Sequence, residues 1–200
     1  MKLVFTTLLF CLFVFSTTGC KKQETKEIFF SKSTNDLVAF TGSPGGLLPP
    51  TPTGIKEFDE KNLMGSIAVI TQIRNSLGEV IGIATEMEFV EPQGNDVFTD
   101  TDWTLKIPGR GTVHLTQVEN VNFIVNAISD MKKNGEITKS FTPPIEVITT
   151  VPGTGKITGG TKEFENITGI CKETNRLHSL NLKTGEIDLE FELEITYKKK

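Results

Sequence analysis

Glycines, threonines and a lysine gather in residues 153–169, GTGKITGGTKEFENITG, and these residue types hold phosphate in nucleotide-binding loops. Such a loop requires the pattern G-x-x-x-x-G-K-[ST], and this chain departs from it twice. Thr150 stands at the first glycine position, and Ile157 replaces the hydroxyl residue that holds magnesium. The stretch also lies between two strand patterns and leads into no helix N-terminus, so it predicts a turn rather than a nucleotide site.

Other motifs for chemistry are absent from the sequence. The two histidines, His114 and His178, lie in separate strand patterns without HxH, HExxH or CxxC spacing, so we expect no metal. There is no G-x-S-x-G elbow for a serine nucleophile. The acidic run 95–103 does not follow the calcium-loop pattern, because Trp103 stands near the place of the turn glycine and ligands. We therefore expect no cofactor and assign no catalytic residue.

One strand pattern carries polar groups among apolar ones. In ITGICKETN (167–175), the alternation that points Cys171 into the core also points Glu173 and Asn175 inward. A carboxylate desolvated in this way has a raised pKa and can orient a ligand or act as an acid or base. The alternative is a bulge, or a strand that ends in water at KETNR. The candidate cavity residues are Trp103, Met87, Cys171, Glu173 and Asn175.

The N-terminus combines a positive start, an apolar run at 3–15 that is too short to span a membrane, and the small residues STTG before Cys20. This resembles a bacterial lipoprotein signal, although Thr17 stands where Leu is commoner. The resemblance implies acylation of Cys20, anchoring in the cell envelope through the lipid, and no spanning helix. Lys21, where an Asp would signal inner-membrane retention, favours the outer membrane, on its periplasmic or surface face. An ordinary secretory signal is the alternative.

The chain of 200 residues fits one domain with a tail. We predict a signal peptide at 1–19, a lipidated tether at 20–56 and a β-barrel domain at 57–200. Within the tether, residues 28–40 contain enough apolar side chains to dock as a strand instead. The net charge of −4 argues against a nucleic-acid partner. Once the signal is removed and Cys20 is lipidated, Cys171 has no disulfide partner, so it is a small core residue or a reactive thiol.

From residue 63 onward, most of the chain alternates with a period of two, which is typical of antiparallel strands with one wet face. The pattern predicts that Trp103 lies close to one core and that four glutamates are exposed. The residues predicted to be in that core are Ile83, Met87, Leu105, Phe191 and Leu193, and the glutamates are Glu86, Glu88, Glu190 and Glu192. Residues 119–136 fit a helix and a strand equally well. We favour a strand and turn there, because Asn134-Gly135 is a hairpin signal.

Seven or eight such strands predict an all-β fold, a small antiparallel barrel of the calycin type, with a β-sandwich as the alternative. The run GGTKEFENITG (159–169) resembles the G-G-T-G-x-F-x-G-A-T-G motif of the dirigent and allene oxide cyclase-like barrels. Lys162, Asn166 and Ile167 depart from that motif. The resemblance implies the barrel fold, with Phe164 plugging one end and Gly169 allowing close strand approach. The residues of this turn motif are Gly159, Gly160, Thr161, Phe164, Asn166 and Gly169.

Three functions remain open at this point. The first is a lipid-anchored, non-catalytic barrel that binds a small apolar ligand or an envelope partner. The second is an isomerase or cyclase that uses the barrel cavity, which is the activity of some proteins of the resembled group. The third is a structural module with a filled core. The missing catalytic constellation favours the first and third over the second.

Overall fold

The computed structural model describes residues 24–41, 66–93 and 96–200, so the predicted signal peptide, Cys20 and about half of the predicted tether lie outside it. The elements in chain order are β1 (Thr25–Lys32), α1 (Ser33–Asp36), β2 (Leu37–Thr41), β3 (Ser66–Arg74), β4 (Val80–Gln93), β5 (Asp96–Ile107), β6 (Gly111–Asn120), α3 (Asn122–Asn134), β7 (Thr138–Ile148), β8 (Lys156–Gly160), the 3-10 turn η1 (Lys162–Phe164), β9 (Ile167–Asn181) and β10 (Glu186–Lys199).

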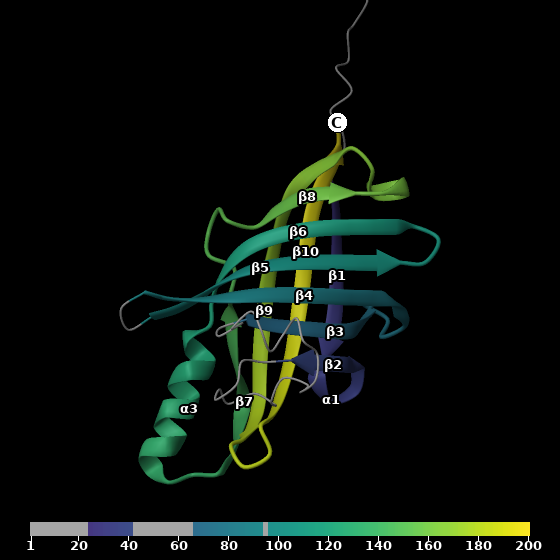
Figure 1. Ribbon diagram of the computed structural model, residues 1–200. Coiled ribbons are helices and arrows are strands. Elements are labelled where there is room, and N and C mark those ends of the chain that lie inside the picture. Colours follow the sequence, from purple (N-terminus) through teal and green to yellow (C-terminus); the bar gives the residue numbers. More distant parts are fainter. Residues whose placement is uncertain (1–23, 42–65, 94–95) are drawn as a thin grey trace, which may run out of the picture.

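The described strands form one curled antiparallel sheet in the order β7-β9-β10-β1-β3-β4-β5-β6-β8, with β2 paired to β3. In Figure 1, β3 to β6 run across β1, β9 and β10 at a steep angle, and α3 lies at the end of the barrel away from β8. The curl brings β8 against β9. The predicted small antiparallel barrel is confirmed, although the sheet has ten strands rather than seven or eight.

The segment 25–41 belongs to the sheet, so the barrel includes residues that lie before the predicted boundary at 57. β1 pairs with β10 along its whole length, from Thr25 opposite Tyr197 to Lys32 opposite Glu190. Phe29 is fully buried in the core. The docked-strand alternative therefore holds for this part of the predicted tether, because EIFF supplies apolar side chains that the core can bury.

The predicted faces of β4 are wrong beyond its first residues. Residue 73 pairs with 82 and residue 74 pairs with 80, which leaves Ile81 as the extra residue of a β-bulge. The bulge shifts the alternation by one residue, so Ala84 and Glu86 are buried and Glu88 also faces the interior. Ile83 and Met87, predicted to be in the core, are exposed on the outer face.

Residues 122–134 form a helix, so the predicted strand and turn at 119–136 is wrong beyond the end of β6. One face of α3 buries Ala127, Ile128 and Met131 against apolar residues of β7, β9 and β10. Gly135 takes a left-handed conformation and donates its N–H to the carbonyl of Lys132. The Asn-Gly pair therefore ends a helix instead of turning a hairpin.

The interior near β8 is filled with apolar side chains, and we call it the filled half. The predicted alternation of β5 and β10 holds, since Trp103, Leu105 and Leu193 are buried in one core. Phe191 belongs to the same core, and its ring centroid lies 4.9 Å from that of Trp103. Glu190 and Glu192 lie on the outer face of β10, where both pair with Arg176.

The turn motif closes the filled half. Phe164 is fully buried, with the ring of Tyr197 at 6.1 Å and the guanidinium of Arg110 at 5.0 Å from its centroid. A Cβ on Gly169 would overlap the carbonyl oxygen of Thr196, so only glycine allows β9 and β10 to approach this closely. Asn166 has φ of 58°, in the left-handed region that asparagine tolerates. The predicted plug and the close strand approach are both present.

Candidate functional site

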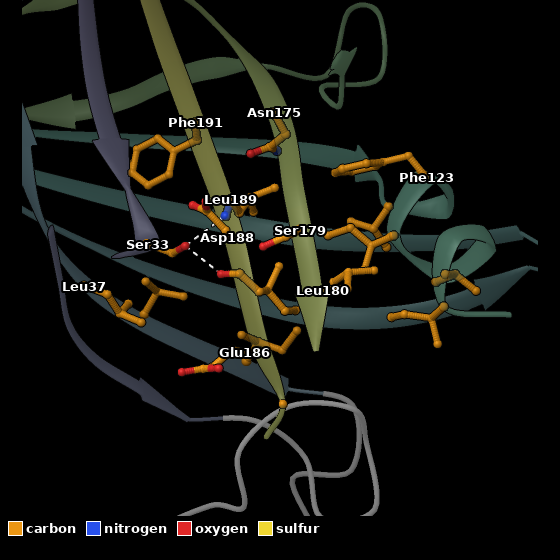
Figure 2. A pocket seen from close by; sticks show the side chains of 18 of the residues that line it. Ser33, Leu37, Phe123, Asn175, Ser179, Leu180, Glu186, Asp188, Leu189 and Phe191 are labelled. Carbon is orange, nitrogen blue, oxygen red and sulfur yellow. Dashed lines mark hydrogen bonds between the residues drawn. The ribbon is translucent and has the colours of Figure 1, made fainter. Parts of the chain in front are cut away.

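A cavity of about 1040 Å³ occupies the other half of the interior, which we call the hollow half. Residues of α1, of α3 and of the turn between β9 and β10 contribute to its lining, and Figure 2 labels Ser33 of α1 and Phe123 of α3 among them. Apolar side chains from several strands and from α3 line its walls, among them Val69, Val97, Ile128, Leu180 and Phe191. The inner end of the cavity is polar instead, because carboxyl groups lie there.

Three glutamates from three strands meet at the bottom of the cavity. Glu86 comes from β4, Glu119 from β6 and Glu173 from β9, and a carboxylate oxygen of each lies within 4.8 Å of the others. All three side chains are buried. We call these residues the carboxyl cluster. Glu88, two residues after Glu86, adds a fourth carboxyl group to the same cavity wall.

The closure of the barrel brings β6 and β9 together at this point. The strand-like segment 149–151 bridges the two strands, with the Thr149 N–H donating to the carbonyl of Glu173 and the Thr149 carbonyl accepting from Asn120 N–H. The Thr150 hydroxyl accepts the N–H of Glu173 at 2.6 Å and donates to Gln117 Oε1 at 2.7 Å. The backbone seam therefore fixes where the side chains of Glu119 and Glu173 begin.

Three N–H donors orient the carboxylate of Glu173. Trp103 Nε1 and Gln117 Nε2 donate to its Oε2 at 3.0 Å and 2.7 Å, and Asn175 Nδ2 donates to its Oε1 at 3.0 Å. Gln117 Nε2 also donates to Glu119 Oε1 at 2.7 Å, so one amide joins two carboxyl groups. These contacts hold the carboxylates in defined orientations, as hydrogen bonds from neighbouring side chains do in binding sites.

Burial raises the pKa of each carboxyl group in this region, because the charged form is removed from water. The pKa values of Glu86 and Glu173 lie well above the usual range, first through desolvation and then through neighbouring carboxylates. The pKa of Glu119 is raised by burial, although its hydrogen bonds oppose the shift. Burial and the charge of Glu119 raise the pKa of Glu88 to about 8. At neutral pH the cluster therefore holds protons or needs a cation.

The predicted cavity residues fall into three groups. Glu173 and Asn175 line the cavity, both from inward positions of β9. Trp103 and Cys171 are buried in the adjoining core, and burial together with Glu173 raises the pKa of Cys171 to about 12, which is typical of a structural thiol. Met87 points out of the barrel, 41% exposed, because of the bulge in β4, so its prediction was wrong.

Sequence reasoning missed Glu86, Glu88, Gln117 and Glu119. Alternation along β6 carries a usable signal for the last two, since Val113 and Leu115 share the inward parity of Gln117 and Glu119. Glu86 and Glu88 could not be predicted to face inward, because nothing in VIGIATEMEF indicates an extra residue at position 81. The expectation of no metal rests on histidine and cysteine spacing and on the calcium-loop pattern of the run 95–103, and neither of these considers carboxylates from separate strands.

No protein-family model and no curated protein matches this chain. Among solved structures, it is similar to the structure of the pterocarpan synthase dirigent protein PsPTS1, with a TM-score of 0.42 and 13% identity. The match covers 89% of this chain and 96% of that chain. None of the helices in the described ranges is long and apolar enough to cross a membrane. Function at this level of similarity has to follow from the chain's own side chains.

Proposed function

We propose that this protein is a lipid-anchored binding protein of the bacterial cell envelope whose barrel takes up a small, largely apolar ligand. The observation that carries the proposal is the cavity of about 1040 Å³ with apolar walls and a polar bottom. Small-molecule sites commonly have this size and this combination of apolar lining with a few placed polar groups. A module with a filled core has no use for such a space.

The ligand class follows from the lining. Val69, Val97, Ile128 and Leu180 favour an apolar body, since they gain by losing contact with water. The buried carboxyl groups favour a ligand with a polar end. That end would donate a hydrogen bond to a carboxylate, or would both donate to and accept from a protonated carboxyl group. We therefore expect a ligand with an apolar body and one hydroxyl, amine or acid group.

The test uses N-phenyl-1-naphthylamine, a dye whose fluorescence rises in apolar surroundings. Val90 lines the cavity and Phe89, its neighbour on β4, lies on the outer face, so they form a matched pair. Val90→Trp should weaken dye binding by about tenfold or more by filling the cavity, whereas Phe89→Trp should leave it unchanged. Fatty acids should displace the dye. If the wild type does not bind the dye, or if both variants lose dye binding equally, the protein is a structural module and the ligand-binding proposal is wrong.

The lipid anchor rests on the N-terminal residues alone. Metabolic labelling with an alkyne fatty acid should label the wild type and spare Cys20→Ser, because the predicted acyl acceptor is the thiol of Cys20. Membrane fractionation of the same two strains should place only the wild type in the outer membrane. Equal labelling of both proteins contradicts the anchor.

The carboxyl cluster also supports a second candidate, an isomerase or cyclase that moves protons in the cavity. Glu119 and Glu173 lie close enough to share a proton, and carboxyl groups with a raised pKa are suited to acid–base work near neutral pH. The two candidates differ in what is recovered after incubation. A binding protein releases its ligand unchanged, whereas an isomerase returns a compound of the same mass with a different structure.

A further inference from the structure

The charge of the carboxyl cluster is not balanced by neighbouring side chains. Lys139 is the one cationic residue among the described residues that line the cavity, and its ammonium group pairs with Glu136 at 2.8 Å. Glu86, Glu119 and Glu173 thus meet without a protein cation beside them. Buried carboxylates are normally paired with a cation or coordinate a metal, because an isolated buried charge is costly.

A second observation comes from Asn175, whose exposed fraction is only 5%. Its Nδ2 donates to Glu173 Oε1 and to Thr149 Oγ1, so the amide lies beside the cluster. Its Oδ1 has no hydrogen-bond partner among the described residues, although it is shielded from solvent. Asn175 lines the cavity (Figure 2). A buried amide oxygen without a donor is unfavourable, and a bound cation would satisfy it.

We propose that the bottom of the cavity is a site for a hard divalent cation of the calcium class, held by Glu86, Glu119 and Glu173. Asn175 Oδ1 supplies a further oxygen. The polar end of the proposed ligand would meet the same carboxyl groups, but the cation site is tested with the cation alone, so its outcome does not depend on the proposed ligand binding.

The donor set decides the class of cation. All four groups offer oxygen, which suits Ca²⁺, Mg²⁺ and Mn²⁺, whereas copper and zinc favour nitrogen and sulfur ligands. Ligands on opposite sides of a calcium ion lie about 4.6–5.2 Å apart, since each Ca–O distance is about 2.3–2.6 Å. One carboxylate oxygen from each of the three glutamates lies within 4.8 Å of the other two, which is within the distance that separates the ligands of a single calcium ion.

The surrounding donors strengthen the assignment. Gln117 and Trp103 hold the carboxylate of Glu173, and Gln117 also holds that of Glu119. Hydrogen bonds of this kind fix the orientation of ligating carboxylates and are typical of the shell around a metal. Gln117 is itself fixed by the Thr150 hydroxyl, which donates to its Oε1.

The probe for this site is terbium(III), a calcium surrogate that emits green light when an excited tryptophan lies within a few ångströms. Trp103 is the single tryptophan of the chain, and its Nε1 lies 3.0 Å from Glu173 Oε2. Excitation of Trp103 at about pH 8, where carboxyl protons are easier to displace, should give saturable terbium emission that calcium competes away. Glu119→Gln and Glu86→Gln should each weaken terbium binding by about tenfold or more.

The matched control is Asp102→Asn. Asp102 is next to Trp103 in sequence but exposed on the outer face of the barrel, so it reports on terbium bound to surface carboxylates. The control should bind terbium as the wild type does. If Asp102→Asn lowers the emission and the two glutamine variants do not, or if the wild type gives no emission, the site does not exist.

Thermal melts with calcium alone keep the test independent of terbium and of any folding defect. Calcium should raise the melting temperature of the wild type and of Asp102→Asn, because a ligand that binds only the folded state stabilises it. It should have little effect on Glu86→Gln and Glu119→Gln. A melt of each variant without calcium shows whether it folds, and one folded variant is enough to decide. An equal calcium effect on all four proteins overturns the proposal.

Discussion

The filled and hollow halves of the barrel are built by the same strands, yet their side chains have opposite chemistry. Along β5 the inward residues pass from Leu105 and Trp103 to Thr101 and Thr99, and along β6 they pass from Leu115 to Gln117 and Glu119. The pairing puts these changes at one level, since Trp103 lies opposite Leu115 and Thr101 lies opposite Gln117. The fold therefore needs only half of each strand to make a core, and the other half is free to form a site.

The two halves also differ in what they contribute to stability. The filled half buries apolar side chains in contact with one another, which is the main favourable term in folding. The hollow half places four carboxyl groups against a cavity, three of them buried, and keeping such groups away from water has a cost in free energy. Such an arrangement is typical of a site retained for binding rather than for stability.

The largest effect should come from opening the filled half. Phe164→Ala removes a fully buried ring that closes the barrel end, so we expect a loss of about 3–5 kcal/mol in the free energy of unfolding. Phe191→Ala should cost less, because Phe191 borders the cavity and its truncation enlarges a space that is already there. Urea unfolding followed by circular dichroism measures both. Equal losses in the two variants contradict a hollow half.

The next effect is a loss of stability with rising pH, measured with the metal chelated. Because the pKa values of Glu86, Glu88, Glu119 and Glu173 are raised in the folded chain, the folded state keeps protons that the unfolded state releases. The free energy of unfolding should therefore fall as the pH rises from about 5 towards 8, by about 1.4 kcal/mol for each unit of pKa difference fully titrated. Most proteins with paired surface carboxylates show the opposite slope in acid.

Glu86→Gln isolates this effect. It removes one buried carboxyl group, so the fall in stability between pH 5 and pH 8 should become smaller. Glu165→Gln is the control, since Glu165 is exposed near the closed end of the barrel. A wild type whose stability is flat over this range, or a control that changes the slope as much as Glu86→Gln, contradicts the desolvated cluster.

The filled half was largely predictable from the sequence, whereas only the part of the hollow half that β9 contributes was predictable. Strict alternation along β10 and along the end of β5 gave the correct inward faces, because those strands run without interruption into an apolar core. The turn motif gave the position of Phe164 at the barrel end. Glu173 and Asn175 followed from the same alternation along β9.

The other features of the structure could not be predicted from the sequence, for three physical reasons. The bulge at Ile81 reversed the faces of β4, and one extra residue leaves no trace in composition. Residues 122–134 fit two periods, and only packing against β7, β9 and β10 selects the helix. The meeting of Glu119 with Glu173 depends on segment 149–151 bridging β6 and β9, and sequence patterns do not show which strands close a barrel.

A smaller effect should follow from loosening the segment 149–151, which joins β6 to β9 beside the carboxyl cluster. Thr150→Val keeps the shape of the side chain but removes the acceptor for Glu173 N–H and the donor to Gln117 Oε1. We expect a loss of about 1–3 kcal/mol in the free energy of unfolding, because two buried groups are left unpaired. Thr104→Val is the control, since Thr104 bonds His114 on the outer face, and it should change stability by less than about 0.5 kcal/mol. If Thr150→Val and Thr104→Val change the free energy of unfolding equally, the segment 149–151 does not take part in the cooperative core.

The smallest effect locates the boundary between the halves. Cys171 is buried two residues before Glu173, on the filled side, and its pKa is raised to about 12 by burial first and by the charge of Glu173 second. In a protein with Cys11 and Cys20 replaced by serine, iodoacetamide at about pH 8 should therefore modify Cys171 about a thousandfold more slowly than in urea, because little thiolate is present. Native and unfolded samples followed by intact mass spectrometry give the two rates. The dye used for the cavity should not change the native rate, since the ligand space ends at Glu173. Fast native modification that the dye blocks would extend the hollow half past Glu173, and Cys171 would then be part of the ligand site.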